Sequence, residues 1–239
     1  MNEKTIQARL EGNAIPFSPD LPARLETYLD LLQRWNEKMD LTAVEGEEEL
    51  LDRHFLDSLT VLKTPLLPDA AKLIDVGTGA GFPGQALALA RPDLRVTLLD
   101  SQRKRLSFLE TVIRETGAEN VTLVHARAED AARQPALREQ FDIACARAVA
   151  PLPVLSELLL PFVRVGGRML CWKGPSLTEE MESGRRAAFL LGGRMEPPVP
   201  CPLADRDWDH RILPVKKEKP TPKMYPRKAG IPKKTPLGT

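Results

Sequence analysis

The chain has 239 residues, enough for one full domain with an extension, and a formal net charge of +1. Its three cysteines, Cys145, Cys171 and Cys201, are too few and too widely spaced for a disulfide framework or a metal site, so we expect no metal and a reducing, cytoplasmic setting. No apolar run approaches 18 residues and the N-terminus lacks a signal pattern, so we expect no contact with a membrane.

The small net charge conceals a strong asymmetry along the chain. Residues 1–70 carry 7 Lys and Arg against 14 Asp and Glu, whereas residues 71–210 carry 18 of each. Residues 211–239 carry 9 basic side chains and a single acidic one. A basic segment of this kind indicates a nucleic-acid or other anionic partner.

The first 70 residues have helical patterns. Apolar side chains recur at three- and four-residue spacing from Leu21 to Trp35, which predicts one helix, and a second apolar stripe predicts another over 47–62. From residue 72 onward, short apolar runs alternate with helical stretches, which predicts an α/β domain with a parallel sheet. The expected strands are 72–76, 96–99, 121–124, 141–145 and 168–172, with two more at 194–199 and 211–215. The expected helices are 84–90, 102–116, 152–162 and 177–190.

These patterns divide the chain into three parts. We expect an N-terminal helical extension over 1–70, a cofactor-binding domain over 71–215 and a basic, proline-rich tail over 216–239. The tail has no helical or strand pattern, so we expect it to be irregular, and flexible unless a partner orders it.

A glycine-rich loop is the sharpest motif. In Asp75-Val-Gly-Thr-Gly-Ala-Gly-Phe-Pro-Gly84 the glycines follow an expected strand and open a helix, where glycine lets the backbone approach a ligand closely. Gly79, Gly81 and Gly84 also match the spacing of dinucleotide sites. Asp75, however, would repel a pyrophosphate and attract a cationic aminopropyl chain, and Asp100 ends the next strand where it can accept both ribose hydroxyls. Together these features favour a class I S-adenosylmethionine (SAM) methyltransferase over a dinucleotide enzyme.

Two further segments are expected to line the same cofactor site as the glycine loop. Ala128 and Glu129 follow the third strand and are candidates for contact with adenine, although Glu129 would also suit a solvated helix start. Arg147 ends the fourth strand, at the edge where open α/β sheets bind ligands, and is the candidate for positioning the substrate or the cofactor. Cys145 lies inside an apolar strand, so a buried structural cysteine is favoured over a nucleophile.

None of the residues expected at the site is an obvious general base for methyl transfer. Guanine N7 offers a lone pair and carries no proton, so its methylation needs orientation more than proton transfer. His54 is either a cleft-facing residue or a histidine packed where the N-terminal extension meets the cofactor-binding domain, with a bond to Asp57. The tail cations and Tyr225 suit phosphate contact and base stacking, although a solubilising tail has a similar composition. The candidate RNA-binding residues are Lys173, Arg211, Lys223, Arg227, Lys228 and Lys233.

The motifs together resemble the bacterial small-subunit ribosomal RNA methyltransferase G family, also called GidB, over nearly the whole chain. The resemblance rests on Trp35-Asn36 with Leu41-Thr42, Arg53-His-Phe-Leu-Asp-Ser58, the glycine loop, Leu98-Leu-Asp-Ser101, Arg147-Ala-Val-Ala150, Lys173-Gly-Pro175 and Tyr225-Pro-Arg-Lys-Ala-Gly-Ile-Pro-Lys233. One departure is Asp40, where the family usually has Asn, and it puts only a local contact of the N-terminal extension in doubt.

The resemblance implies a Rossmann-like fold with a seven-stranded, mostly parallel sheet and an N-terminal helical extension. It implies SAM-dependent methylation of N7 of one guanosine in the 530 loop of 16S ribosomal RNA, acting on the RNA or on a small-subunit particle. The implied cofactor-binding residues, with those from the motif itself, are Asp75, Gly77, Gly79, Gly81, Phe82, Asp100, Ser101, Ala128, Glu129 and Arg147. We further expect a monomer. Two other functions stay open from the residues alone, namely methylation of a protein or small molecule and nucleotide sensing without catalysis.

Overall fold

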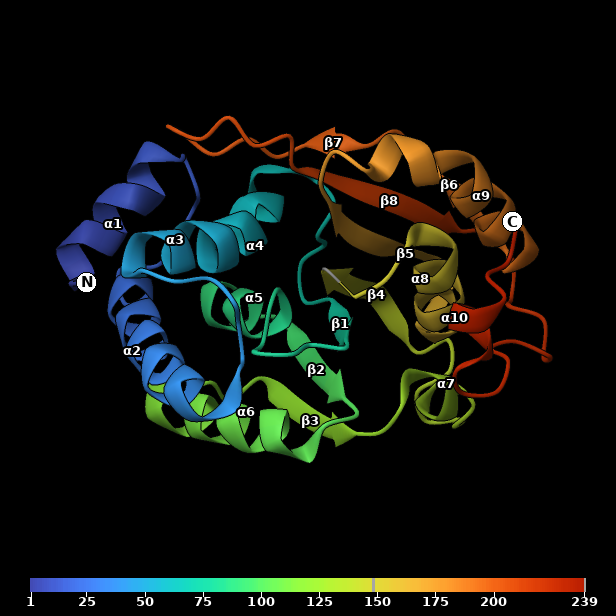
Figure 1. The fold of residues 1–239 in the computed structure, drawn as a ribbon, viewed down its shortest axis with the longest axis horizontal. Coiled ribbons are helices and arrows are strands. Elements are labelled where there is room, and N and C mark those ends of the chain that lie inside the picture. Colours follow the sequence, from blue (N-terminus) through green and yellow to red (C-terminus); the bar gives the residue numbers. More distant parts are fainter. Residues whose placement is uncertain (148, 239) are drawn as a thin grey trace.

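A computed structural model describes residues 1–147 and 149–238, and one mixed sheet lies at its centre (Figure 1). The strand order is β3-β2-β1-β4-β5-β8-β6, and the two-residue β7 pairs with β8. The first five strands are parallel, whereas β8 is antiparallel to both β5 and β6. The strands are β1 (Lys72–Val76), β2 (Arg95–Asp100), β3 (Val121–His125), β4 (Phe141–Arg147), β5 (Val163–Lys173), β6 (Gly193–Met195), β7 (Val199–Pro200) and β8 (Arg211–Lys217).

The helices begin and end near the expected positions over most of the chain. The longer ones are α1 (Glu3–Gly12), α2 (Leu21–Met39), α5 (Gly84–Ala90), α6 (Arg103–Thr116), α8 (Leu152–Leu159) and α9 (Leu177–Leu190). The short ones are α3 (Glu47–Leu50), α4 (Asp57–Leu59), α7 (Ala128–Ala131) and α10 (Ile231–Lys234). A π-helical turn, η1 (Leu51–Leu56), joins α3 to α4, and the 3-10 turns are η2 (Thr60–Lys63) and η3 (Leu160–Phe162).

The two faces of the sheet are covered by different parts of the chain. Alternate residues of each strand point to opposite faces, so Leu73 and Ile143 join one apolar cluster and their neighbours Ile74 and Ala144 join the other. The first cluster includes the buried side chains of α1, α2, α5 and α6, and the second those of α8 and α9. Figure 1 shows these two groups of helices on opposite sides of the sheet. The extension 1–70 therefore shares one core with the sheet.

The expected α/β sheet with parallel strands is confirmed, but it has eight strands among the described residues where seven were expected. The expected 194–199 strand consists of two pieces, β6 and β7, that pair with different parts of β8. Helix α1 was not expected, because its only buried apolar residues are Ile6 and Leu10. The expected 47–62 helix is broken into four turns of different hydrogen-bond spacing.

The tail differs from the expectation of a flexible segment. Strand β8 continues two residues past 215, and the buried Lys217 at its end donates to the carbonyls of Leu160 and Val163 and to Thr221 Oγ1. Beyond it, the chain runs back over α7 and α8, where side chains from both regions hold it. The three-part division of the chain stays a prediction, with its second boundary falling inside a strand.

The strand order indicates at which edge of the sheet a ligand would bind. Strand β1 pairs with β2 on one side and with β4 on the other, so the chain direction of the connections reverses at β1. In open α/β sheets, ligands bind in the crevice beyond the carboxyl ends of the strands at such a reversal. The glycine loop, Asp100 and Arg147 all follow or end these three strands.

Candidate functional site

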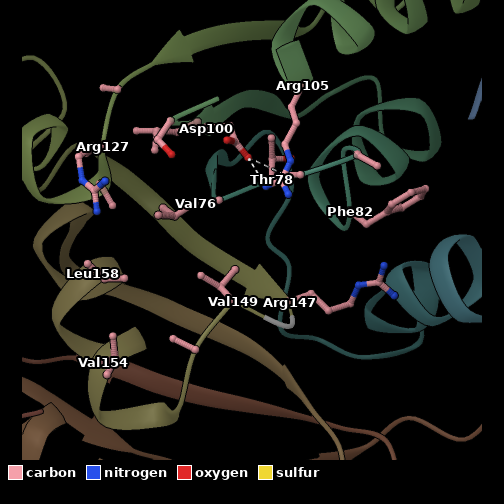
Figure 2. Close-up of a pocket in the computed structure, with 18 of the residues that line it drawn as sticks. Val76, Thr78, Phe82, Asp100, Arg105, Arg127, Arg147, Val149, Val154 and Leu158 are labelled. Atoms are coloured by element: carbon pink, nitrogen blue, oxygen red, sulfur yellow. Dashed lines mark hydrogen bonds and ion pairs between the residues drawn. The ribbon is translucent and has the colours of Figure 1, made fainter. Parts of the chain in front are cut away.

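A cavity of about 480 Å³ lies beyond the carboxyl ends of β1 to β4 (Figure 2). Its volume is within the range of small-molecule and cofactor sites. Eight of the ten predicted cofactor residues line it: Gly77, Gly79, Phe82, Asp100, Ser101, Ala128, Glu129 and Arg147. Figure 2 shows Phe82 and Arg147 at one side of the cavity and Asp100 and Arg127 toward the other.

The glycine loop presents bare backbone to the cavity. Gly77 and Gly79 have φ angles of +72° and +60°, a conformation that residues with a Cβ adopt at a cost. Among the described residues, a Cβ on Gly79 would lie 4.0 Å from its nearest neighbour, and one on Gly77 would contact only the side chain of Val149. Gly81 instead faces the protein interior, where a Cβ would collide with the hydroxyl of Tyr28. That hydroxyl donates to the carbonyl of Ala80, so helix α2 holds the loop from behind.

Asp75 lies under the loop and does not line the cavity. Its Oδ2 accepts hydrogen bonds from Thr78 Oγ1 at 2.7 Å and from the Gly84 amide at 2.9 Å, which ties both ends of the loop together. Its Oδ1 is buried and has no partner among the described residues. Burial raises the pKa of this carboxyl from 3.8 to about 6. The expected contact between Asp75 and a cationic chain stays a prediction, for which Oδ1 is the free acceptor.

The raised pKa makes a testable statement about stability. A carboxyl with a higher pKa in the folded than in the unfolded chain stabilises the fold below pH ~4 and loses that contribution as the pH rises to ~6. We expect Asp75→Asn, which cannot titrate, to flatten this pH dependence in urea unfolding of the ligand-free protein at pH 4.5 and 6.5. Asp93→Asn is the control, because Arg91 lowers the pKa of Asp93 to about 2 and it does not titrate in this window. Equal slopes for Asp75→Asn and the wild type would contradict the assignment.

Asp100 joins the loop to the cavity. Its Oδ2 accepts from the Gly79 amide at 3.0 Å and its Oδ1 from the Gln102 amide at 2.8 Å, with Arg105 at 3.5 Å. The carboxylate is 2% exposed yet lines the cavity, so a ligand that reaches it meets a fixed pair of acceptors. Toward the far end, the Glu129 side chain accepts from the Gly230 amide at 3.0 Å.

Arg147 lies at the centre of a cluster formed by residues 53–57 and Phe82. It donates to the carbonyl of Arg53, to Asp57 Oδ2 at 3.1 Å and to His54 Nδ1 at 2.8 Å. Its guanidinium also lies 5.4 Å from the ring centroid of Phe82. The carbonyl of Arg53 and the ring of His54 are both presented by the π-helical turn η1, a feature frequent at functional sites.

His54 combines the two roles considered for it. Its ring lines the cavity and stacks on Phe82 with centroids 5.0 Å apart, but both nitrogens are also satisfied inside the protein. Because a guanidinium only donates, Nδ1 accepts from Arg147 and Nε2 donates to Thr42 Oγ1 at 2.7 Å. Burial, reinforced by Arg147, lowers the pKa of His54 to about 3. His54 is therefore neutral with its lone pair engaged.

The predicted bond between His54 and Asp57 is wrong. Asp57 is 3% exposed, and its carboxylate binds Arg147 and the Nδ1 of His210, at 2.9 Å, instead. Its carbonyl also accepts from Trp172 Nε1 at 3.0 Å. Cys145 is buried in β4 and burial raises the pKa of its thiol well above the usual value, so a thiolate nucleophile is excluded at this position.

A second cavity of about 340 Å³ adjoins the first. His54, Arg147 and Ala150 line both, so these residues form the boundary between the two spaces. The remaining wall of the second cavity combines an aromatic ring with hydrogen-bonding groups. It consists of Val44, Arg53, Asp57, Leu155, Trp172, Lys173, Gly174, Ser176 and His210.

The six predicted RNA-binding residues fall into two groups. Lys173 pairs with Glu180 at 2.6 Å, Arg211 with Asp209 at 2.8 Å and Arg227 with Glu157 at 2.6 Å. Lys223, Lys228 and Lys233 are exposed, and Lys233 also lines the first cavity. Contact of all six with RNA stays a prediction, and the exposed lysines are the better placed for it.

Sequence reasoning missed several residues of the site. Tyr28 falls within the expected helix from Leu21 to Trp35 and Gly230 within a motif of the resemblance, but neither was expected at the site, and nothing near His210 in the sequence marks it. They reach the site through contacts that span 52, 101 and 153 residues. Thr42, in contrast, stands in a Leu-Thr pair that the resemblance had already singled out.

Comparison with known proteins identifies the family. The family model described as GidB, rRNA small subunit methyltransferase G, matches residues 22–203. The protein named ribosomal RNA small subunit methyltransferase G from Clostridium beijerinckii is 50% identical over 227 residues, covering 95% of each chain. The protein of the same name from Alkaliphilus oremlandii is 49% identical over 214 residues, covering 90% of each chain.

Solved structures show the same fold at low sequence identity. Aeropyrum pernix fibrillarin with bound S-adenosyl-L-methionine matches with a TM-score of 0.52 and 17% identity, over 67% of this chain and 72% of that one. A variant of the 16S rRNA (adenine(1408)-N(1))-methyltransferase from Catenulisporales acidiphilia matches with a TM-score of 0.52 and 19% identity, over 64% and 87%. The chain therefore belongs to the rRNA small subunit methyltransferase G family, and its fold is that of the class I SAM-dependent methyltransferases.

Proposed function

We propose that this protein is a SAM-dependent methyltransferase that methylates N7 of a guanosine in the 530 loop of 16S ribosomal RNA. The observation that carries the proposal is the pair of adjoining cavities that meet at Arg147 and His54. The first has the features of a cofactor site and the second those of a site for an aromatic acceptor. We propose further that the protein acts as a monomer in the cytoplasm, on the RNA or on a small-subunit particle.

The residues of the first cavity fit SAM. Open backbone at Gly77 and Gly79 leaves room for close approach, and Asp100 offers carboxylate oxygens where a ribose would be held. The orphaned Oδ1 of Asp75 lies beneath the loop and suits a cationic group. When bound, SAM supplies a methyl group activated on a sulfonium sulfur.

The groups between the cavities suit an acceptor that carries no proton to remove. His54 is neutral and its Nδ1 lone pair is taken by Arg147, while Arg147 itself is a cation. Neither can serve as a general base, so the task of this boundary is orientation and exclusion of water. Guanine N7 has a lone pair in the ring plane and needs no base, which supports it as the acceptor.

The second cavity is the proposed position of the acceptor base. A base taken out of its stack is commonly held between aromatic and polar side chains, and Trp172, His210 and Lys173 provide both kinds here. The names of the relatives give ribosomal RNA of the small subunit. The choice of the 530 loop rests on the resemblance of the motifs to the family.

A substitution in the second cavity tests its use without disturbing the first. Ser176 is exposed, lines the cavity and makes no capping hydrogen bond, so Ser176→Phe adds bulk without removing a contact. We expect rRNA methylation to fall by about tenfold or more with unchanged SAM affinity, because a displaced acceptor loses alignment. Thr178→Phe, exposed on the same helix outside the cavity, is the matched control. Equal turnover of both variants would contradict the placement of the base.

The proposed reaction itself is tested with 16S rRNA from a strain that lacks the gene. Purified protein with radiolabelled SAM is expected to label one nucleotide, and mapping by N7-specific chain cleavage is expected to place it in the 530 loop. Labelling of a protein or small molecule instead would favour the alternative methyltransferase. SAM binding without transfer would favour a nucleotide sensor, and NAD binding without SAM binding a dinucleotide enzyme.

A further inference from the structure

We infer that the C-terminal segment 218–238 is a wall of the cofactor cavity, held in place by Arg227, and that RNA bound to its lysines tightens SAM binding. The inference rests on the proposed function for the identity of the two ligands. It makes Arg227 a positioning residue that acts through the segment and touches neither ligand.

The wall is visible in the contacts at the adenine end of the cavity. Gly230, Pro232 and Lys233 line the cavity together with Ala128 and Glu129, the residues predicted to meet adenine. The Gly230 amide donates to Glu129 Oε1 at 3.0 Å, which joins the segment to the predicted cofactor contact directly. Pro232 is buried against the body of the protein. A ligand in this cavity therefore has protein from both the sheet and the C-terminal segment around it.

Arg227 is the main anchor of the wall. Its guanidinium donates to both carboxylate oxygens of Glu157, at 2.9 and 2.6 Å, and its backbone amide donates to Oε1 at 2.7 Å. Glu157 is fully buried on α8, so the pair is a bidentate one with little access to water. Loss of the arginine would leave a buried carboxylate without its counter-ion, a strongly unfavourable state. The same guanidinium donates to the carbonyl of Thr235 at 2.8 Å, which fixes the far end of the lining turn.

Two further arginines hold the approach to the wall. Arg138 donates to the carbonyls of Thr221 and Tyr225, each at 2.9 Å, and Arg133 donates to that of Pro226. These bonds use backbone acceptors, so they fix the path of the segment whatever its side chains do. The segment is thus attached along its length and not only where it leaves β8.

The same segment presents cations outward. Lys223 and Lys228 are exposed, while Arg227 between them points inward to Glu157. RNA phosphates gathered by these lysines would hold the outer side of the wall whose inner side meets the cofactor. Two ligands that stabilise the same arrangement raise each other's affinity by the same factor, which for coupled sites is commonly between about 5- and 150-fold.

Calorimetry on the full-length protein tests both parts of the inference. SAM affinity is measured with and without a 16S rRNA fragment that contains the 530 loop, and RNA affinity with and without SAM. We expect the RNA to tighten SAM binding by about fivefold or more in the wild type, and SAM to tighten RNA binding equally. An identical SAM affinity with and without bound RNA would overturn the coupling.

Substitutions separate the wall from the charges. Arg227→Ala is expected to weaken SAM binding about tenfold without RNA and to abolish the coupling, with partial rescue by Arg227→Lys. Gly230→Ala is the second variant, because its φ of +83° strains any residue with a Cβ while that Cβ would meet open space. Lys223→Gln with Lys228→Gln is expected to weaken RNA binding and leave SAM affinity without RNA unchanged. Arg164→Ala, which breaks a surface pair with Asp142, is the matched control.

The outcomes separate this inference from the proposed function. If the wild type neither binds SAM nor methylates rRNA, the proposed function fails. If the wild type does both, but folded Arg227→Ala and Gly230→Ala bind SAM with wild-type affinity, the wall is wrong while the function stands. Equal loss of SAM affinity in the lysine variant, measured without RNA, would likewise contradict a wall held by Arg227.

Discussion

Replacement of Asp100 by alanine is expected to weaken SAM binding by about 100-fold, which corresponds to about 2.8 kcal/mol. Two losses combine in this variant. The cavity loses the carboxylate that would hold the ribose, and the amides of Gly79 and Gln102 lose the acceptor that fixes the glycine loop and the following turn. Both amides would then lack their present acceptor, so the loop would no longer be held in its binding geometry.

Calorimetric titration with SAM measures this effect, with Asp93→Ala as the matched control. Asp93 precedes β2 and Asp100 ends it, and both accept a backbone amide, but Asp93 lies far from the cavity beside Arg91. The control is expected to bind SAM as the wild type does. Asp100→Asn, which keeps one acceptor oxygen, is expected to bind SAM with an affinity between those of Asp100→Ala and Asp93→Ala. Wild-type affinity in a folded Asp100→Ala protein would rule out the assigned role.

Replacement of Arg147 by alanine is expected to lower the rate of rRNA methylation by about 100-fold and the free energy of unfolding by about 3 kcal/mol. The stability loss follows from the almost fully buried carboxylate of Asp57, which would keep His210 as its one partner among the described residues. The rate loss follows because Arg147 holds the boundary between the cavities in place. Without it, His54 Nδ1 loses its hydrogen-bond donor and the carbonyl of Arg53 in η1 loses its donor as well. Single-turnover methylation assays and urea unfolding measure the two effects.

Arg147→Lys separates charge from geometry in this cluster. Lysine keeps a cation beside Asp57, but a single ammonium group does not reproduce the planar fork that binds Asp57, His54 and the carbonyl of Arg53 together. We expect most of the stability to return while the methylation rate stays low. Recovery of the full rate would show that the positive charge alone is sufficient and would contradict a positioning role.

The fold could be predicted largely from local patterns. Parallel strands buried on both faces are continuous apolar runs, and all five expected parallel strands overlap observed ones. Helix α1 escaped notice because two buried residues do not make a stripe, and η1 because π-helical hydrogen bonding leaves no mark in an apolar pattern. Strands β6 and β7 merged in the prediction because each is defined by its pairing with β8 rather than by its own residues.

In the site, too, the features set by local sequence could be predicted and those set by contacts between distant segments could not. The glycine loop, Asp100 and Arg147 could be located because each follows directly from the end of a strand. The partners of these residues could not, because they depend on where distant segments meet. Asp57 binds His210 and not its neighbour His54, and Arg227 turns inward to Glu157 although its own segment is rich in cations. Burial decided both cases, and a single sequence does not reveal which carboxylate will be buried.

The position of β8 also governs the order in which this chain can fold during synthesis. Strand β8 lies between β5 and β6, yet it is the last strand to be made. Until Lys217 has left the ribosome, β5 has an open edge and β6 has no partner in the sheet. Open edges are where nascent chains pair wrongly with one another. Completion of this sheet therefore waits for the synthesis of β8, and a chain that stops short of β8 exposes the edge of β5 that the folded protein covers.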